Sequence, residues 1–494
     1  MSTRHIANGL DRRSFLKTTA ALGGTLAFGS PWAPAWAAAP LLTVDSRTIE
    51  VNGKAAKVFG ITGPNGKPGI IATEGDRLKG TVLNASSEPL QLHWHGQVKT
   101  PADQDRARPD GTPLAAGQTD TYDFELTPGT QWMHSHSLTE QQMLAAPLIT
   151  RERDAGDVQD VVVMLHDFAF RSPQEILAEL GGNNTHSGDK VGSATTSHDA
   201  GMPNIPAQGN AGHTMGGMGG MGHMMTMTHA NDVRYDAYLA NDRTLDDPEV
   251  VKVDKGGRVR LRIINGATAT AFFVATPGLD SKCIAVDGSP CQPIAAASYP
   301  IAQGQRLDLL VELPPEGGAF PVLAQVEGAK AVTGIVLAAG SAQVSKLAST
   351  QNHAQSLVDL TFESQLRALA PVTAKTADKS FMVMLGENAG YRWTINGRVH
   401  GQHTPFEVRQ GERVEMTFMN PTSMMHPMHL HGHHFQVVGI GGQRFSGAIR
   451  DTLIVPAHAP ITVAFDANLK GSWFLHCHHL YHMATGMMTE VRVA

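Results

Sequence analysis

The segment 471–488, GSWFLHCHHLYHMATGMM, concentrates thiolate, thioether and imidazole side chains near the C-terminus. Its metal-binding candidates are His476, Cys477, His478, His482 and Met487. Successive side chains of an extended strand point to opposite faces, so Cys477 faces one way and its two neighbouring histidines face the other. A thiolate with imidazoles and a weak thioether is the ligand set of an electron-transfer copper, whereas imidazoles alone suit a copper that reacts with dioxygen. One strand is therefore expected to serve two metal sites.

Three segments elsewhere in the chain repeat one another. They are GDRLKGTVLN at 75–84, GGRVRLRIIN at 256–265 and GERVEMTFMN at 411–420. Each begins with a turn glycine, alternates apolar and polar residues, and ends in asparagine, which predicts a half-buried strand leading into a loop. The repeats predict an all-β chain with three related units.

The histidines that follow these repeats predict a shared metal cluster. Nine and eleven residues after the asparagine, the first copy has His93 and His95 and the third has His429 and His431, whereas the second has Val274 and Thr276. A second pair, His134 and His136, corresponds to His476 and His478. Each pair places two imidazoles on one face of a strand. Eight imidazoles exceed the needs of one metal, so we expect several coppers between the outer units, with the middle unit as a spacer.

Composition agrees with this organisation. The chain has 494 residues, enough for about three domains, and its 51 glycines and 28 prolines with only 17% charged residues favour many short strands. The formal net charge of −6 does not suggest nucleic-acid binding.

The N-terminal segment 1–37 reads as a twin-arginine export signal. It contains Arg12 and Arg13, an apolar stretch to Phe28 and a small-residue cleavage site ending at Ala37. No later stretch is apolar and long enough to span a bilayer. The sequence therefore predicts a periplasmic protein that is exported already folded and does not insert in a membrane.

The three cysteines do not form a disulfide framework. Cys283 and Cys291 flank a turn-like Asp-Gly-Ser-Pro sequence, and both a disulfide and two buried thiols fit this spacing. Cys477 is the one cysteine with neighbouring histidines.

Taken in order and at their spacing, the histidine motifs resemble those of three-domain multicopper oxidases. The motifs are His93-Trp94-His95-Gly96, His134-Ser135-His136, the run from His426 to Gly432, and His476-Cys477-His478 with His482 and Met487. The resemblance implies three cupredoxin-like Greek-key β-sandwich domains, at 38–155, 156–345 and 381–494, with a linker at 346–380.

The resemblance also implies four coppers per chain. The type 1 ligands would be His426, Cys477, His482 and Met487. The type 2 ligands would be His93 and His429. The type 3 pair would be held by His95, His134, His136, His431, His476 and His478. His426 and His482 are expected on loops near the surface, and Cys477 is bonded through the backbone to His476 and His478, which gives electrons a short path to the cluster.

Protons must also reach the cluster. Asp110, in an Asp-Gly pair, matches the position of the family's acid beside the cluster, although an ordinary turn aspartate is the alternative. Some relatives carry an acid just after the last type 1 histidine, whereas this chain has Met483 and so lacks a carboxylate for a proton route at that position. His433 and His434 are expected to be core or supporting residues.

A methionine-rich insertion at about 181–231 interrupts the second domain. Its methionines are Met215, Met218, Met221, Met224, Met225 and Met227. The segment has too few bulky residues to form a core, and thioethers select Cu(I), so it predicts an extra Cu(I)-binding element.

The sequence thus favours an oxidase that takes single electrons from Cu(I), and more broadly from phenols and aromatic amines, and reduces O2 to water. A laccase-type phenol oxidase and a copper-sequestering protein are the alternatives. The physiological reductant and the oligomeric state are not predicted.

Overall fold

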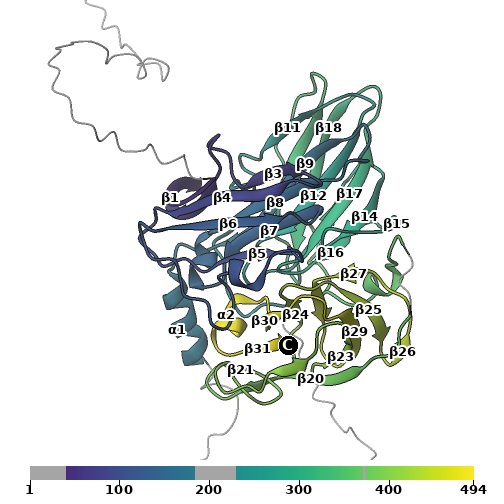
Figure 1. The fold of residues 1–494 in the computed structure, drawn as a ribbon. Coiled ribbons are helices and arrows are strands. Elements are labelled where there is room, and N and C mark those ends of the chain that lie inside the picture. The colour runs from purple at the N-terminus through teal and green to yellow at the C-terminus, as the bar shows by residue number, and fades with distance from the viewer. Residues whose placement is uncertain (1–40, 184–229, 371–373) are drawn as a thin grey trace, which may run out of the picture. The chain divides into compact units, whose positions relative to one another are not determined.

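The computed structural model describes residues 41–183, 230–370 and 374–494, and these described residues form one compact unit built from six β-sheets (Figure 1). The predicted export signal and the six methionines from Met215 to Met227 lie outside the described residues. Within the described ranges, every helix is too short or too polar to cross a bilayer.

The first pair of sheets uses residues 42–151. One sheet has the order β2 (Lys54–Thr62), β1 (Leu42–Val51), β4 (Arg77–Asn84) and β6 (Thr119–Glu125). The other has the order β3 (Ile70–Thr73), β8 (Ala145–Arg151), β7 (Gly129–Ser135) and β5 (Leu92–His95). Their facing apolar side chains, including Leu78, Trp94 and Leu148, form one buried cluster.

The second pair of sheets uses residues 159–339. One has the order β10 (Ala237–Ala240), β9 (Gln159–Phe168), β12 (Arg258–Asn265), β17 (Arg306–Glu312), β14 (Ser281–Val286) and β15 (Ser289–Ile294). The other has the order β11 (Val250–Val253), β19 (Val332–Ala339), β18 (Gly318–Val326), β13 (Phe272–Ala275) and β16 (Tyr299–Ile301). Cys283 and Cys291 are both buried here as free thiols.

The third pair of sheets uses residues 379–493. One has the order β21 (Arg392–Ile395), β20 (Lys379–Asn388), β23 (Arg413–Met419), β29 (Ile461–Asp466), β25 (Phe435–Ile440) and β26 (Gln443–Arg444), with β27 (Ile449–Arg450) also on β25. The other has the order β22 (Phe406–Val408), β31 (Met488–Val493), β30 (Gly471–Cys477), β24 (His426–Leu430) and β28 (Thr452–Val455).

Helical segments are short connections among these strands. They are α1 (Pro173–Asn183), α2 (Leu480–Ala484), and the 3₁₀ turns η1 (Ala102–Gln104), η2 (Leu138–Gln142) and η3 (Glu363–Gln365).

The strand topology repeats three times. The repeated strands β4, β12 and β23 each lie between a parallel neighbour, β1, β9 or β20, and an antiparallel one, β6, β17 or β29. This repetition confirms the predicted all-β fold of cupredoxin-like sandwiches. The domain boundaries given above remain a prediction.

The asparagine at the end of each repeat bonds the loop that follows it and a second segment of the same sandwich. Asn84, Asn265 and Asn420 are buried, and each side-chain amide donates two hydrogen bonds to backbone carbonyls beyond its own strand. An amide that is fully bonded in the core stabilises the loop that follows, which explains why the repeat ends in this residue.

The strands that carry the histidine pairs are buried on both faces. All residues of β5, β7 and β24 are buried, as are the last five of β30. One face of each strand packs in the core of its own sandwich. The opposite face is turned towards the other sandwich that carries histidine pairs. His93 lies opposite His134, and His429 lies opposite His476, so the duplicated pairs occupy matching registers.

Candidate metal centre

Three side chains converge at one end of the third sandwich. The Cys477 Sγ lies 3.7 Å from the Nδ1 atoms of both His426 and His482, and those two nitrogens are 3.2 Å apart. Met487 is completely buried in the same apolar cluster as Cys477. One thiolate and two imidazoles at these separations fit a single copper, with a thioether available as a weak fourth ligand.

The elements that carry this trio differ from the expectation. His426 begins strand β24 and His482 lies in helix α2, and both are completely buried, so the prediction that they come from loops is wrong. Strand and helix fix these side chains more firmly than loops would. Trp393 stacks on His482 at 3.9 Å between ring centroids, which further limits its rotation.

One carboxylate reaches this trio from the surface. Asp232 has 19% of its side chain exposed, and its Oδ2 lies 3.6 Å from the free Nε2 of His482. The Tyr391 hydroxyl donates to the same carboxylate at 2.5 Å, and His479 Nε2 lies 3.2 Å from its other oxygen. Although burial opposes ionisation, His479 and His482 hold the pKa of Asp232 well below its usual range. A negatively charged and partly exposed carboxylate therefore lies beside the trio.

Eight further imidazoles gather between the first and third sandwiches. His93 and His429 face each other, with their Nε2 atoms 3.2 Å apart. In a second set, His476 Nε2 lies 3.2 Å from His136 Nε2 and 3.1 Å from His431 Nε2. A third set has ring centroids 5.1 to 5.6 Å apart and consists of His95, His134 and His478. The predicted eight-histidine cluster is thus brought together as one pair and two triads.

The nitrogens of these rings divide into two kinds. In the third set, His95 Nδ1, His134 Nε2 and His478 Nε2 are buried without a hydrogen-bond partner among the described residues. The second nitrogen of such a ring is oriented by the protein. In the His93–His429 pair, for example, His429 Nδ1 donates a hydrogen bond to the Asp451 carbonyl at 2.8 Å. Metal-binding histidines typically use one nitrogen for the metal and the other for such a bond. The donor set and its free nitrogens fit copper.

Burial favours the neutral, metal-binding form of several of these rings. None of the ten histidines is more than 5% exposed. Desolvation holds the pKa of His93, His431 and His476 well below the ordinary value, and it lowers the pKa of His482 to about 3. Neutral imidazoles retain the lone pair that a metal needs. Burial also raises the pKa of the Cys477 thiol, so its deprotonation depends on a cation beside it.

The acid beside the cluster is Asp105, not Asp110. The Asp110 carboxylate is 84% exposed and pairs with Arg108 at 3.0 Å, so the prediction for Asp110 is wrong. Asp105 Oδ2 lies 2.8 Å from His93 Nδ1, and burial raises the pKa of Asp105 to about 8. The family spacing pointed to the right loop, but the turn formed by η1 brings an acid five residues earlier onto the histidine.

A second buried acid was not foreseen. Glu140 Oε2 lies 3.2 Å from His134 Nδ1, and its Oε1 lies 4.0 Å from His478 Nδ1. Met483, which stands where some relatives carry an acid, is buried and contributes no carboxylate. The sequence signal for Glu140 was its position four residues after His136, which places it in the 3₁₀ turn η2 beside the same strand end.

The middle sandwich supplies an arginine to the cluster although it has no histidine pair. Arg306 from β17 donates to the Asp451 carboxylate at 2.7 Å, and Asp451 lies 3.2 Å from His95 Nε2. Arg306 also donates to the Thr130 carbonyl of β7 at 3.1 Å. The interpretation of the middle unit as a spacer is therefore incomplete, because this side chain joins all three sandwiches.

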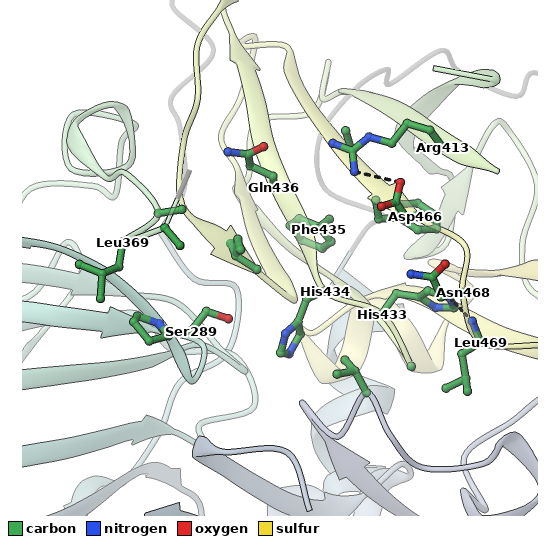
Figure 2. A pocket seen from close by; sticks show the side chains of 18 residues that line it. Ser289, Leu369, Arg413, His433, His434, Phe435, Gln436, Asp466, Asn468 and Leu469 are labelled. Carbon is green, nitrogen blue, oxygen red and sulfur yellow. Dashed lines mark hydrogen bonds and ion pairs between the residues drawn. The ribbon is translucent and has the colours of Figure 1, made fainter. Parts of the chain in front are cut away.

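Two cavities approach the cluster. The first has a volume of about 510 Å³, and Figure 2 shows His434 among its lining side chains, with Arg413 and Asp466 paired at its far end. His434 Nε2 lies 3.7 Å from Asp451, and His433 is buried against Trp473, so both histidines support the site without joining the pair or the triads. The second cavity, about 560 Å³, is lined by His136 and Met483.

Comparison with known proteins places these features in a family. Three family models, each described as multicopper oxidase, match residues 43–154, 194–342 and 373–494. Multicopper oxidase MmcO of Mycobacterium tuberculosis is 30% identical over 460 residues, covering 91% of this chain and 86% of that protein. A copper resistance protein A homolog of Pseudomonas syringae is 24% identical and covers 98% of this chain and 99% of its own length. The solved multi-copper oxidase of Pseudomonas thermotolerans superposes with a TM-score of 0.64 at 20% identity, covering 92% of this chain and 98% of that one.

Proposed function

The chain belongs to the multicopper oxidase family, and on that premise we propose that it oxidises Cu(I) one electron at a time and passes four electrons to O2. Membership makes it a copper-dependent oxidoreductase. We propose the identity of its electron donor and the ligands of each copper.

In the proposed arrangement, His426, Cys477 and His482 with Met487 hold the type 1 copper. His93 and His429 hold the type 2 copper. The type 3 coppers are held by His95, His134 and His478 and by His136, His431 and His476. Copper in these sites would supply one-electron uptake at the first and reduction of O2 to water at the other three. The fit of the free nitrogens and of the sulfur-nitrogen triangle supports this assignment.

The observation that carries the proposed donor is Asp232. Its partly exposed carboxylate touches His482 at the nitrogen that faces away from Cys477. A carboxylate at the point of electron entry favours a cationic donor through charge attraction. Asp232 also follows directly on the methionine-rich segment, whose thioethers suit Cu(I). The copper resistance relatives support the same donor.

The buried acids have a proposed part at the cluster. Asp105 accepts a hydrogen bond from His93 Nδ1 and so turns Nε2 towards His429. Glu140 orients the His134 ring in the same way, through its contact with Nδ1. Because O2 reduction consumes protons, we assign these two carboxyl groups to hold protons beside the cluster, with Glu140 serving in place of an acid at Met483.

The cellular location belongs to the same proposal. Segment 1–37 has the features of a twin-arginine signal. Export to the periplasm would allow the protein to act on toxic copper outside the cytoplasm.

Oxygen uptake tests the donor directly. The rate is measured with Cu(I) and with 2,6-dimethoxyphenol for the copper-loaded wild type, Asp232→Asn, a deletion of 212–229, and Asp110→Asn as an exposed-acid control. Asp232→Asn should lower kcat/KM for Cu(I) about tenfold, the order expected from one lost charge attraction at a partly exposed site. Asp110→Asn should behave as the wild type.

The proposal fails if Cu(I) is oxidised no faster than the phenol and neither Asp232→Asn nor the deletion changes that rate. Retained phenol oxidation would then favour a laccase-type enzyme. If neither donor consumes O2 although copper is bound, sequestration becomes the better account.

A further inference from the structure

His166 is a buried histidine whose ring forms no hydrogen bond with the described part of the chain. It lies on β9, is 5% exposed, and neither ring nitrogen has a hydrogen-bond partner among the described residues. Buried imidazoles are nearly always hydrogen-bonded or bound to a metal, so this ring requires an explanation.

His166 lines a cavity that it shares with Met164. The cavity has a volume of about 670 Å³ and lies among β8, β9 and the turn at Asn241. Residues 164 and 166 are two apart on one strand, so both side chains point to the same face. A Cβ atom placed on Gly266 would lie 2.9 Å from Met164 Cε and 3.1 Å from His166 Nε2. These two atoms are therefore no more than about 6 Å apart, and any side chain at position 266 would press on both of them.

The electrostatic surroundings of His166 leave its lone pair available. Burial is the main cause that lowers the pKa of His166 to about 4, so the ring is neutral near pH 7. The charged groups that face it are Asp242, Asp167 and Arg47, and Arg47 is paired with Asp242 at 2.6 Å. The Asp167 carboxylate is already bonded to the backbone of Thr268 and Ala269.

We propose that Met164 and His166 form a binding site for a soft monovalent cation, Cu(I), separate from the family's copper ligands. A neutral imidazole and a thioether select Cu(I), whereas Zn²⁺ and Mg²⁺ require more numerous or anionic ligands. The site involves binding alone and no electron transfer, so it is independent of the proposed oxidase activity.

The site lies behind the wall of the histidine cluster. Met164 packs in one buried apolar group with Trp132, and Trp132 stacks on His134 with ring centroids 4.1 Å apart. A Cu(I) ion held by Met164 and His166 would therefore be separated from that cluster by the tryptophan ring.

The test counts Cu(I) on the full-length holoenzyme. The protein is first reduced without oxygen, so that its resident coppers take no electrons, and Cu(I) is then added in competition with bicinchoninate. Wild type is compared with His166→Phe and Met164→Leu, and with the exposed-residue controls His353→Ala and Met384→Leu. The methionine-rich segment is present in every protein, so differences in stoichiometry isolate the new site.

The proposal predicts one Cu(I) fewer in both His166→Phe and Met164→Leu, and wild-type stoichiometry in the controls. X-ray absorption of the added Cu(I) should lose one sulfur neighbour in Met164→Leu. Unchanged stoichiometry in both site variants, or loss in His166→Phe alone, would overturn the proposal. Wild-type blue colour and phenol oxidation in each variant verify folding, and neither readout depends on whether Cu(I) is the enzyme's substrate.

Discussion

Arg306 and Asp451 form a completely buried ion pair that joins the middle sandwich to the histidine cluster. Two guanidinium nitrogens of Arg306 donate to the two carboxylate oxygens, and burial leaves both side chains 1% exposed or less. Asp451 in turn lies 3.2 Å from His95 Nε2 and 3.6 Å from His429 Nδ1. A bidentate pair of this kind fixes both position and charge. The position of two cluster histidines therefore depends on a side chain from a domain without ligands.

Removing the arginine should damage both stability and copper retention. Arg306→Met leaves Asp451 buried without its main counter-charge, which is expected to cost about 3–5 kcal/mol. Thermal unfolding of the apo protein measures the first effect, and copper content after dialysis against a chelator measures the second. Arg306→Lys restores the charge but not the fork, so it should recover stability more than copper retention. Wild-type copper retention in Arg306→Met would contradict this role.

The two aspartates of the 102–111 segment should respond in opposite ways. Asp105→Asn weakens the hydrogen bond that orients His93, and loss of such partners typically lowers metal affinity or activity by 10–100-fold. Asp110→Asn changes an exposed carboxylate and should have no effect. Copper affinity and oxygen uptake are measured on both variants. Equal losses in the two variants would show that the loop as a whole, rather than Asp105, matters.

A buried glutamate outside the histidine cluster should make stability depend on pH. Burial raises the pKa of Glu327 from its ordinary 4.5 to about 7, and its Oε1 accepts the Val358 N–H at 2.6 Å. Because the folded-state pKa is higher, the native protein binds more protons between these values, and stability falls as pH rises from about 4.5 to 7. The accumulated cost is about 3 kcal/mol at most.

Glu327→Gln keeps the acceptor and removes the charge. Its advantage in thermal midpoint over the wild type should therefore be small at pH 5 and grow up to about pH 7. A constant difference across this range would mean that Glu327 does not titrate as described.

The histidine positions could be predicted because strand periodicity and duplication are local properties. His93 and His95 share a face in any extended strand, and the matching pair at His429 and His431 fixes the register. The supporting residues could not be predicted in this way. Arg306 and Asp451 are 145 residues apart, and their contact depends on how separate sandwiches pack.

Asp105 and Asp232 were missed for different reasons. Asp110 and Asp105 lie in one loop, and only the path of the backbone through η1 decides which carboxylate reaches His93. Asp232 directly follows the methionine-rich segment, where no strand pattern indicates its position, and its contact with His482 spans 250 residues. Sequence periodicity identifies ligands on strands, whereas tertiary packing selects the groups that orient them.

Electron transfer through Cys477 should be indispensable. Cys477→Ser keeps a small side chain but removes the thiolate, so the blue colour and nearly all oxygen uptake should disappear, while the eight-histidine cluster should still bind copper. Optical absorption, copper content and oxygen uptake are measured together. Substantial turnover without the thiolate would contradict the proposed path.

The stoichiometry of Cu(I) oxidation against O2 consumption tests the central claim most directly, because it requires both sites and their connection. Cu(I) is added in known amounts to the copper-loaded protein, and dissolved oxygen, Cu(II) and hydrogen peroxide are measured after completion. Reduction of O2 to water by single-electron steps requires four Cu(I) oxidised for each O2 consumed and no peroxide. Two Cu(I) for each O2, with peroxide released, would contradict the account.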